Sequence, residues 1–199
     1  MYKHIYFEPW IGRYYRKRPR PRILVLGESH YEASIQNRDF TRKLTEQFVR
    51  GDWAHRFWTN ISQVISGRHH TEIDRAATWH GIAFYNYIQV IAANRPRKAP
   101  TPQMFSDAEP AFFELLAKLR PTHVIVCGFR LWCDLPPFGG RTGTFRQGRR
   151  VHPWGEYVVG GHVIRAMPIC HPSTGFSAPH WNPAVRRFLS DDLPDRRRR

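Results

Sequence analysis

The stretch RILVLGESHYEAS, residues 22–34, decides how the rest of the sequence is read. Its first half, RILVLG, is apolar on both faces, which is typical of a strand in a parallel sheet covered by helices. Glu28, Ser29 and His30 follow the glycine at once. Ligands of parallel α/β sheets bind at the carboxyl ends of strands, so this placement favours a functional loop. A turn with surface polar groups is the alternative.

Strands and helices alternate along the rest of the chain. We predict strands over 22–27, 83–91 and 122–128, a hairpin over 157–171, helices over 38–51, 52–67, 106–121, 129–135 and 182–193, and loops over 94–105 and 136–156. This alternation predicts an α/β fold, a three-layer α/β/α sandwich with a central, mostly parallel four-stranded sheet.

Turn and capping residues predict where the helices begin and end. Gly51 and Gly67 each follow an amphipathic run and are typical helix stops. Asp52 is a candidate cap for the second helix. Ser106 opens a capping box with Pro110 in the first turn, which predicts the start of the helix over 106–121.

The composition indicates one globular domain over residues 1–199, with a basic N-terminal arm over 1–21 and a basic tail over 196–199. No apolar run approaches the roughly 20 residues of a membrane span, and the N-terminus lacks the apolar core of a signal peptide. We therefore expect a cytoplasmic monomer. The three cysteines form no CxxC pair, so we expect reduced thiols and no metal or other cofactor.

The net charge of +15, from 31 Lys and Arg against 16 Asp and Glu, points to a polyanionic partner. DNA is the expected partner because arginine and lysine can neutralise backbone phosphates along a groove. A basic surface that only aids solubility is the alternative.

Three clusters of polar residues end predicted strands. The first is Gly27–Tyr31, the second is Asn86 within FYNYIQ, and the third is HPS, residues 171–173. Each has an ordinary reading, as a turn or as a hydrogen-bonded edge amide. Their coincidence at strand ends favours a single crevice.

The order and spacing of these motifs resemble the uracil-DNA glycosylase superfamily. GESHY stands where that family has GQDPY or GEAPG, FYNYIQ resembles its base-binding strand, NRPRKAPTP its NR-P-P loop, and HPSTG its HPS loop. The resemblance covers roughly residues 22–190. It implies a DNA glycosylase that flips out uracil or a modified pyrimidine and hydrolyses its N-glycosidic bond, leaving an abasic site.

The resemblance also implies roles for individual residues. His171 would donate to the pyrimidine O2 as negative charge develops there, and Asn86 would read the edge of the base. Backbone N–H groups around Gly27, Glu28 and Ser29 would contact the base. Phe40 would stack on the base, with Trp79 or Phe84 behind it, and a plain core role is the alternative for Phe40.

Departures from the family motif bear on the substrate. Ser29 stands where the family has its aspartate, so Glu28 is the nearest carboxylate that could orient water or balance the oxocarbenium charge. His30 replaces a proline and adds a titratable group to the catalytic turn. Tyr31 matches the tyrosine that guards the pyrimidine C5 position and favours uracil. A pocket with Glu28 and His30 would instead suit an enlarged, polar pyrimidine, such as a hypermodified cytosine of viral DNA, giving an antiviral role.

The remaining candidates contact DNA. Ser173 belongs to the HPS loop, Arg95 to the NR-P-P loop, and Arg149 and Arg150 would meet phosphates. Phe176 is a candidate wedge for the gap left by the flipped base, or a loop aromatic packed on Trp181. GRRVH resembles the KRRIH loop of a branch with a covalent histidine, which would make His152 a nucleophile.

Two further readings stay open. One is a non-catalytic binder of damaged or single-stranded DNA on the same fold, which the loss of the aspartate favours. The other is a GE-x-H hydrolase, in which Glu28 and His30 activate water or bind a metal or haem.

Overall fold

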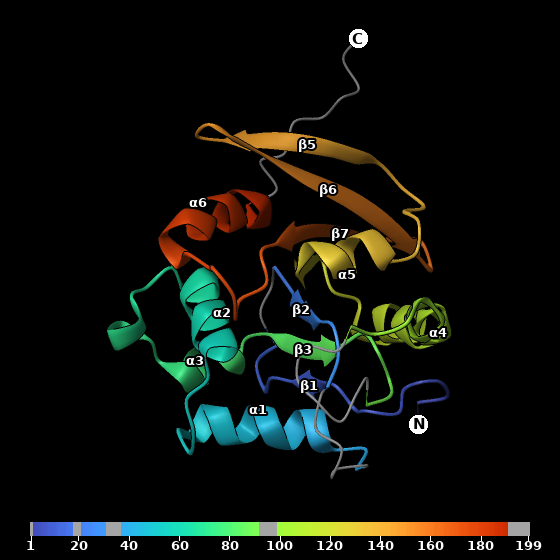
Figure 1. Ribbon diagram of the computed structural model, residues 1–199, viewed down its shortest axis with the longest axis horizontal. Coiled ribbons are helices and arrows are strands. Elements are labelled where there is room, and N and C mark those ends of the chain that lie inside the picture. The colour runs from blue at the N-terminus through green and yellow to red at the C-terminus, as the bar shows by residue number, and fades with distance from the viewer. Residues whose placement is uncertain (1, 18–20, 31–36, 92–98, 191–199) are drawn as a thin grey trace.

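The computed structural model describes residues 2–17, 21–30, 37–91 and 99–190. Seven strands form one mixed sheet in the order β1-β3-β2-β4-β7-β6-β5, with helices on both sides (Figure 1). The strands are β1 Trp10–Ile11, β2 Ile23–Gly27, β3 Ala83–Asn86, β4 His123–Cys127, β5 Thr142–Gln147, β6 Arg150–Val159 and β7 His162–Ile169. The helices are α1 Phe40–Arg50, α2 Arg56–Ser66, α3 Arg75–Trp79, α4 Pro102–Leu119, α5 Phe129–Asp134 and α6 Ala178–Leu189, with a 3-10 turn at His70–Glu72.

Four central strands, β3, β2, β4 and β7, run parallel, whereas β1, β6 and β5 pair antiparallel. The α/β class is therefore confirmed, but the predicted four-stranded sheet is wrong in the number of strands. The difference comes mainly from 136–156, predicted as a loop, part of which forms β5 and the start of β6. Phe145, His152 and Trp154 point into the core from this hairpin, and Gly148 makes its turn at a φ of 60°. Alternate residues of the hairpin are buried, but the glycines and arginines around its turn make the sequence resemble a loop.

The sheet has two apolar faces, each with its own layer of helices. Val25 and Ile125 face a core built with α1, α2, α3 and α6, whereas Leu24 and Val124 face a core built with α4 and α5. Figure 1 shows α2, α3 and α6 on one side of the sheet and α4 and α5 on the other. Burial of both faces explains why β2 and β4 read as continuous apolar runs.

The predicted helix ends are partly confirmed. Gly51 and Gly67 adopt left-handed conformations after α1 and α2, as predicted. Asp52 does not cap α2, which begins at Arg56 after His55, whose Nδ1 accepts from the N–H of Phe57 at 3.3 Å.

The start of α4 lies before the predicted capping box. Thr101 caps the helix, its Oγ1 accepting from the N–H of Met104 at 3.3 Å, and Pro102 occupies the first position. Pro110 therefore lies inside the helix. This earlier start brings Phe105 into the core, which favours it over a start at Ser106.

Two other predictions differ in length or location. The strand predicted over 83–91 ends at Asn86, and the final helix begins at Ala178 rather than 182. The predicted hairpin over 157–171 is confirmed: β6 and β7 join at Gly160 and Gly161, both with positive φ. The predicted basic tail over 196–199 lies outside the described residues.

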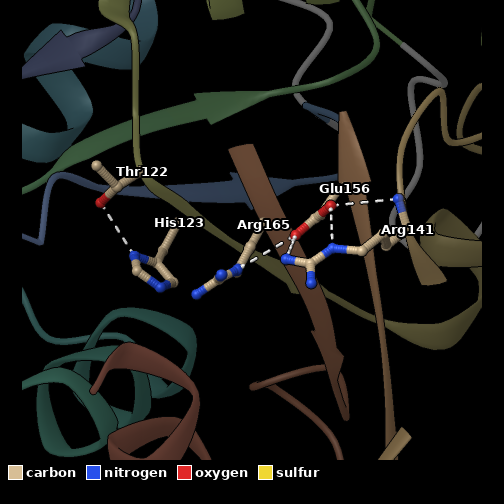
Figure 2. Close-up of polar contacts among 5 residues, drawn as sticks. All are labelled: Thr122, His123, Arg141, Glu156 and Arg165. Atoms are coloured by element: carbon tan, nitrogen blue, oxygen red, sulfur yellow. Dashed lines mark hydrogen bonds and ion pairs between the residues drawn. The ribbon is translucent and has the colours of Figure 1, made fainter. Parts of the chain in front are cut away.

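Glu156 joins the outer hairpin to the sheet. Its side chain is 4% exposed, and it accepts from Arg141 Nη2 at 2.9 Å, Arg141 Nε at 3.1 Å and Arg165 Nε at 3.4 Å. Figure 2 shows the carboxylate between the two guanidinium groups, with Thr122 Oγ1 3.0 Å from His123 Nδ1 nearby. Burial alone would raise the pKa of Glu156, but hydrogen bonds and charge from Arg141, with Arg165, outweigh it and lower that pKa.

We expect Glu156→Gln to lower the free energy of unfolding at pH 7 by about 1.5–3 kcal/mol, the range for hydrogen bonds to a charged group. Because the folded pKa is depressed, this stability is present above the unfolded value near 4.3 and is lost as pH falls through the folded value. The advantage of the wild-type protein over the variant should thus shrink progressively as pH falls below about 5. Urea unfolding of both proteins from neutral to acidic pH tests it, and an advantage that does not change on acidification would contradict it.

Candidate functional site

The carboxyl ends of the four parallel strands bring the predicted clusters to one edge of the sheet. Gly27 of β2 pairs with Asn86 of β3, and Cys127 of β4 pairs with Ile169 of β7. Residues that follow these ends, including Glu28 and His171, therefore emerge at the same edge.

Glu28 forms a two-pronged ion pair with Arg130, in the first turn of α5. Arg130 Nε lies 2.8 Å from Glu28 Oε2, and Arg130 Nη2 contacts Oε1. The Glu28 side chain is 8% exposed, whereas half of the arginine side chain is exposed. Paired N–H donors hold a carboxylate in one orientation, so the acidic turn after β2 is fixed by the helix after β4.

His171 is held as a hydrogen-bond donor. Its Nδ1 accepts from the backbone N–H of Ser173 at 3.2 Å, so the neutral ring carries its proton on Nε2. Desolvation lowers the pKa of His171, the charge of Glu28 opposes this, and Arg130 and His55 lower the pKa further. The imidazole is thus neutral near pH 7, with one N–H available.

Asn86 and His30 form a buried polar pair. Asn86 Nδ2 lies 3.2 Å from each ring nitrogen of His30, and His30 Nε2 lies 2.9 Å from Thr41 Oγ1. Burial lowers the pKa of His30 to about 4, so its ring is neutral at physiological pH. His30, predicted as a titratable catalytic residue, is therefore a neutral partner of Asn86 at physiological pH.

Aromatic rings enclose this imidazole. The ring centroid of Phe40 lies 4.7 Å from that of His30, and the centroid of Phe7 lies 5.0 Å away. Phe40 thus packs on His30. Trp79 and Phe84, expected behind Phe40, instead belong to the α1–α2–α3–α6 core.

Gly27 is required by the close approach of Asn86. A Cβ at residue 27 would lie 2.1 Å from Asn86 Oδ1, far inside contact distance. The amide therefore lies directly against the backbone of Gly27. The Ser29 hydroxyl, two residues further along the chain, is buried with no hydrogen-bond partner in the described structure. Buried side-chain hydroxyls in folded proteins usually have such a partner.

Sequence reasoning missed several residues of this edge. Arg130 follows the end of β4, and the same strand-end rule that singled out Glu28 would have found it. Phe57 lies 5.7 Å from His171 and 5.9 Å from Phe84, ring centroid to centroid, and closes the edge on the α2 side. Phe7 and Thr41 had no local signal, because their contacts to His30 arise from the tertiary fold.

The predicted DNA-binding residues lie around the loop 170–177 and the β5–β6 turn. Phe176 stacks on Trp181, with ring centroids 6.4 Å apart and planes 14° apart, as in the packing alternative. Arg149 and Arg150 are exposed at the turn. His152 is buried in β6 against Phe145, with centroids 5.3 Å apart. Tyr31 and Arg95 lie outside the described residues.

A pocket of about 470 Å³ opens beside this loop. Arg150, His152, Cys170, Ser177 and Trp181 are among its lining residues. It adjoins the strand-end cluster, by which we mean Glu28, Asn86 and His171, because Cys170 immediately precedes His171.

Over the described ranges, no group of three or more His, Cys, Asp or Glu is arranged to hold a metal ion. None of the helices in those ranges is long and apolar enough to cross a membrane. Comparison with models of known families and with curated protein sequences gave no match to this chain.

We expect the ring of His30 to titrate at about pH 4 in the folded protein, well below the unperturbed value near 6.5. Because the unfolded state binds this proton more readily, stability should fall as pH drops from about 6.5 to about 4. Histidine ring NMR spectra, with His30→Gln to assign the signal, measure this. A folded-state titration near 6.5 would contradict the buried pair.

Proposed function

We propose that the protein is a DNA glycosylase that everts a pyrimidine nucleotide, hydrolyses its N-glycosidic bond and leaves an abasic site. Uracil, or an enlarged pyrimidine such as a hypermodified cytosine of viral DNA, is the proposed base, and in the second case the role is antiviral. The observation that carries the proposal is the meeting of Glu28, Asn86 and His171 at one edge of a parallel sheet. Their resemblance to the uracil-DNA glycosylase motifs supports the same assignment.

The leaving base is stabilised by His171. When the bond between C1′ and the pyrimidine nitrogen breaks, its electron pair moves into the base and places negative charge on O2. A preorganised donor aimed at that oxygen stabilises the transition state more than the ground state. The Ser173 N–H fixes the His171 tautomer that supplies such a donor from Nε2.

Glu28 acts on the sugar side. Positive charge develops at C1′ and the ring oxygen, and a nearby carboxylate stabilises it or orients the attacking water. Water adds its oxygen to C1′ as the bond to the base breaks, and the proton that the water loses passes through solvent to neutralise the departing base anion. Arg130 holds the Glu28 carboxylate in one orientation. Glu28 can therefore take the role of the aspartate that the family has at the position of Ser29.

Entry of the base requires a change at His30. In the present arrangement its imidazole contacts Asn86 and packs on Phe40, the two residues proposed to read and stack the base. A pyrimidine is a flat ring with hydrogen-bonding edges, so it can replace the imidazole against the same neighbours. We propose that the everted base displaces His30.

We expect His171→Ala to lower the rate of base release by about 10²–10³-fold, the effect of removing one preorganised donor, while DNA affinity changes little. Asn86→Ala should lower the rate similarly by removing the edge reader. Base release is measured on DNA containing uracil, hydroxymethylcytosine or glucosylated cytosine, with abasic sites detected by alkaline cleavage. His70→Ala, at an exposed histidine of the 3-10 turn, is the matched control.

Absence of abasic product from all three substrates, with folded wild-type protein, would remove the proposal. A second function would then remain, a non-catalytic binder of damaged or single-stranded DNA. The engagement of Asn86 by His30 is the observation that favours it, because the amide is already hydrogen-bonded. Retained affinity for DNA without turnover identifies this function.

We expect His30→Gly to lower KM for DNA that carries the target base, because the competing imidazole is gone and Asn86 is open. A fall in KM by about tenfold corresponds to about 1.4 kcal/mol of competition. Steady-state kinetics on the best substrate measure it, and circular dichroism checks that the variant is folded. A raised KM in a folded variant would contradict displacement and assign His30 a direct role in binding.

A further inference from the structure

The pocket beside the loop 170–177 has the size of a small-molecule site. Its volume of about 470 Å³ falls in the range of clefts that hold ligands. Residues from four segments line it: Phe129 at the start of α5, Arg150 and His152 of β6, Ser177 of the loop, and His180 and Trp181 of α6.

One wall of the pocket is positively charged. Arg150 Nη1 lies 2.7 Å from His180 Nε2, and the side chain of His152 is 3% exposed with no hydrogen-bond partner for its Nε2 in the described structure. Desolvation lowers the pKa of both histidines, and Arg150 lowers each further. Arg150 therefore keeps its positive charge beside a neutral imidazole, and its guanidinium is suited to contact an anion in the pocket.

Part of the pocket lining is apolar and exposed. Phe129 is 48% exposed and Val151 is 50% exposed, although both line the pocket. A half-exposed aromatic ring and an arginine in one pocket are the pairing with which proteins stack bases and contact phosphates of single strands.

We propose that this pocket binds one nucleotide unit of a DNA strand, with its base on Phe129 and its phosphate toward Arg150. The inference rests on the proposed function, because the bound unit is then a neighbour of the everted nucleotide. Phe129 directly precedes Arg130, the partner of Glu28, and Cys170 directly precedes His171, so two segments of the pocket lining each lie one residue from the strand-end cluster. A free nucleotide presents the same chemistry, and the test separates the two sources.

Fluorescence anisotropy with a short labelled oligothymidylate that carries no modified base tests the pocket apart from catalysis. We expect Phe129→Ala to weaken binding by about 5- to 100-fold, the range for losing one stacked base. Arg150→Gln should reduce the slope of log affinity against log salt by about 0.7, the value for one phosphate of a single strand.

Matched controls come from exposed residues outside the pocket lining. Val158→Ala removes apolar surface at the other end of β6, and Arg186→Gln removes one positive charge from the outer face of α6. Neither should reproduce the effects at the pocket.

Titration with thymidine monophosphate distinguishes the source of the nucleotide. Oligonucleotide binding that Phe129→Ala and Arg150→Gln weaken, with only weak monophosphate binding, supports the strand. Tight monophosphate binding with the same sensitivity, and no effect on the oligonucleotide, overturns the strand and assigns a free nucleotide. Wild-type affinity of both ligands in both variants overturns the pocket assignment altogether.

Base release by the same variants keeps the two proposals distinct. If base release occurs but the pocket variants bind DNA like the wild-type protein, only the pocket assignment is wrong. If no base is released but the pocket variants lose affinity, the pocket assignment stands and the glycosylase function falls.

Discussion

The parallel pairing of Gly27 with Asn86 is the constraint on which the strand-end cluster depends. Asn86 Oδ1 lies where any side chain at residue 27 would have to stand, so the two strands can end side by side only with glycine there. Beyond the strands, the N–H groups of Tyr87 and Ile88 donate to the carbonyls of Gly27 and Glu28, both at 2.9 Å. The turn that carries Glu28 is thereby held by backbone bonds before its side chain meets Arg130.

Under the proposed function, the buried polar pair behind this turn would give the site a demanding form of selectivity. Asn86, His30 and Thr41 are buried and hydrogen-bonded to one another, so an entering base would have to replace every hydrogen bond that it breaks. A base with the right edge restores them, and one without that edge leaves a buried amide unpaired. Sites built on buried hydrogen bonds reject such analogues more strongly than apolar pockets do. Because His30 is neutral, displacing its imidazole would cost only hydrogen bonds and packing contacts, and no ion pair.

The sequence predicted the parallel centre of the sheet better than its edges. Runs such as 22–27 are buried on both faces and leave little ambiguity, and Gly51 stops α1 through its own backbone preference. The sequence predicts a loop over 136–156, where β5 and the first half of β6 form, because this stretch is rich in glycine and arginine. Its burial comes from α6, which no local pattern reveals. The strand-end residues of the site followed from topology, whereas the contacts of His30 depend on side chains brought together from distant segments.

The arrangement of charge separates structural arginines from those available to a polyanion. Arg130, Arg141 and Arg165 engage the buried carboxylates of Glu28 and Glu156, so part of their charge offsets internal acids. These three arginines and two glutamates together retain one positive charge, so nearly all of the net charge of +15 lies on other residues. Arg150 stands apart because its hydrogen bond goes to a neutral imidazole rather than to a carboxylate. No carboxylate in that contact offsets the charge of Arg150. A phosphate beside the loop 170–177 would therefore be attracted by the full charge of the guanidinium.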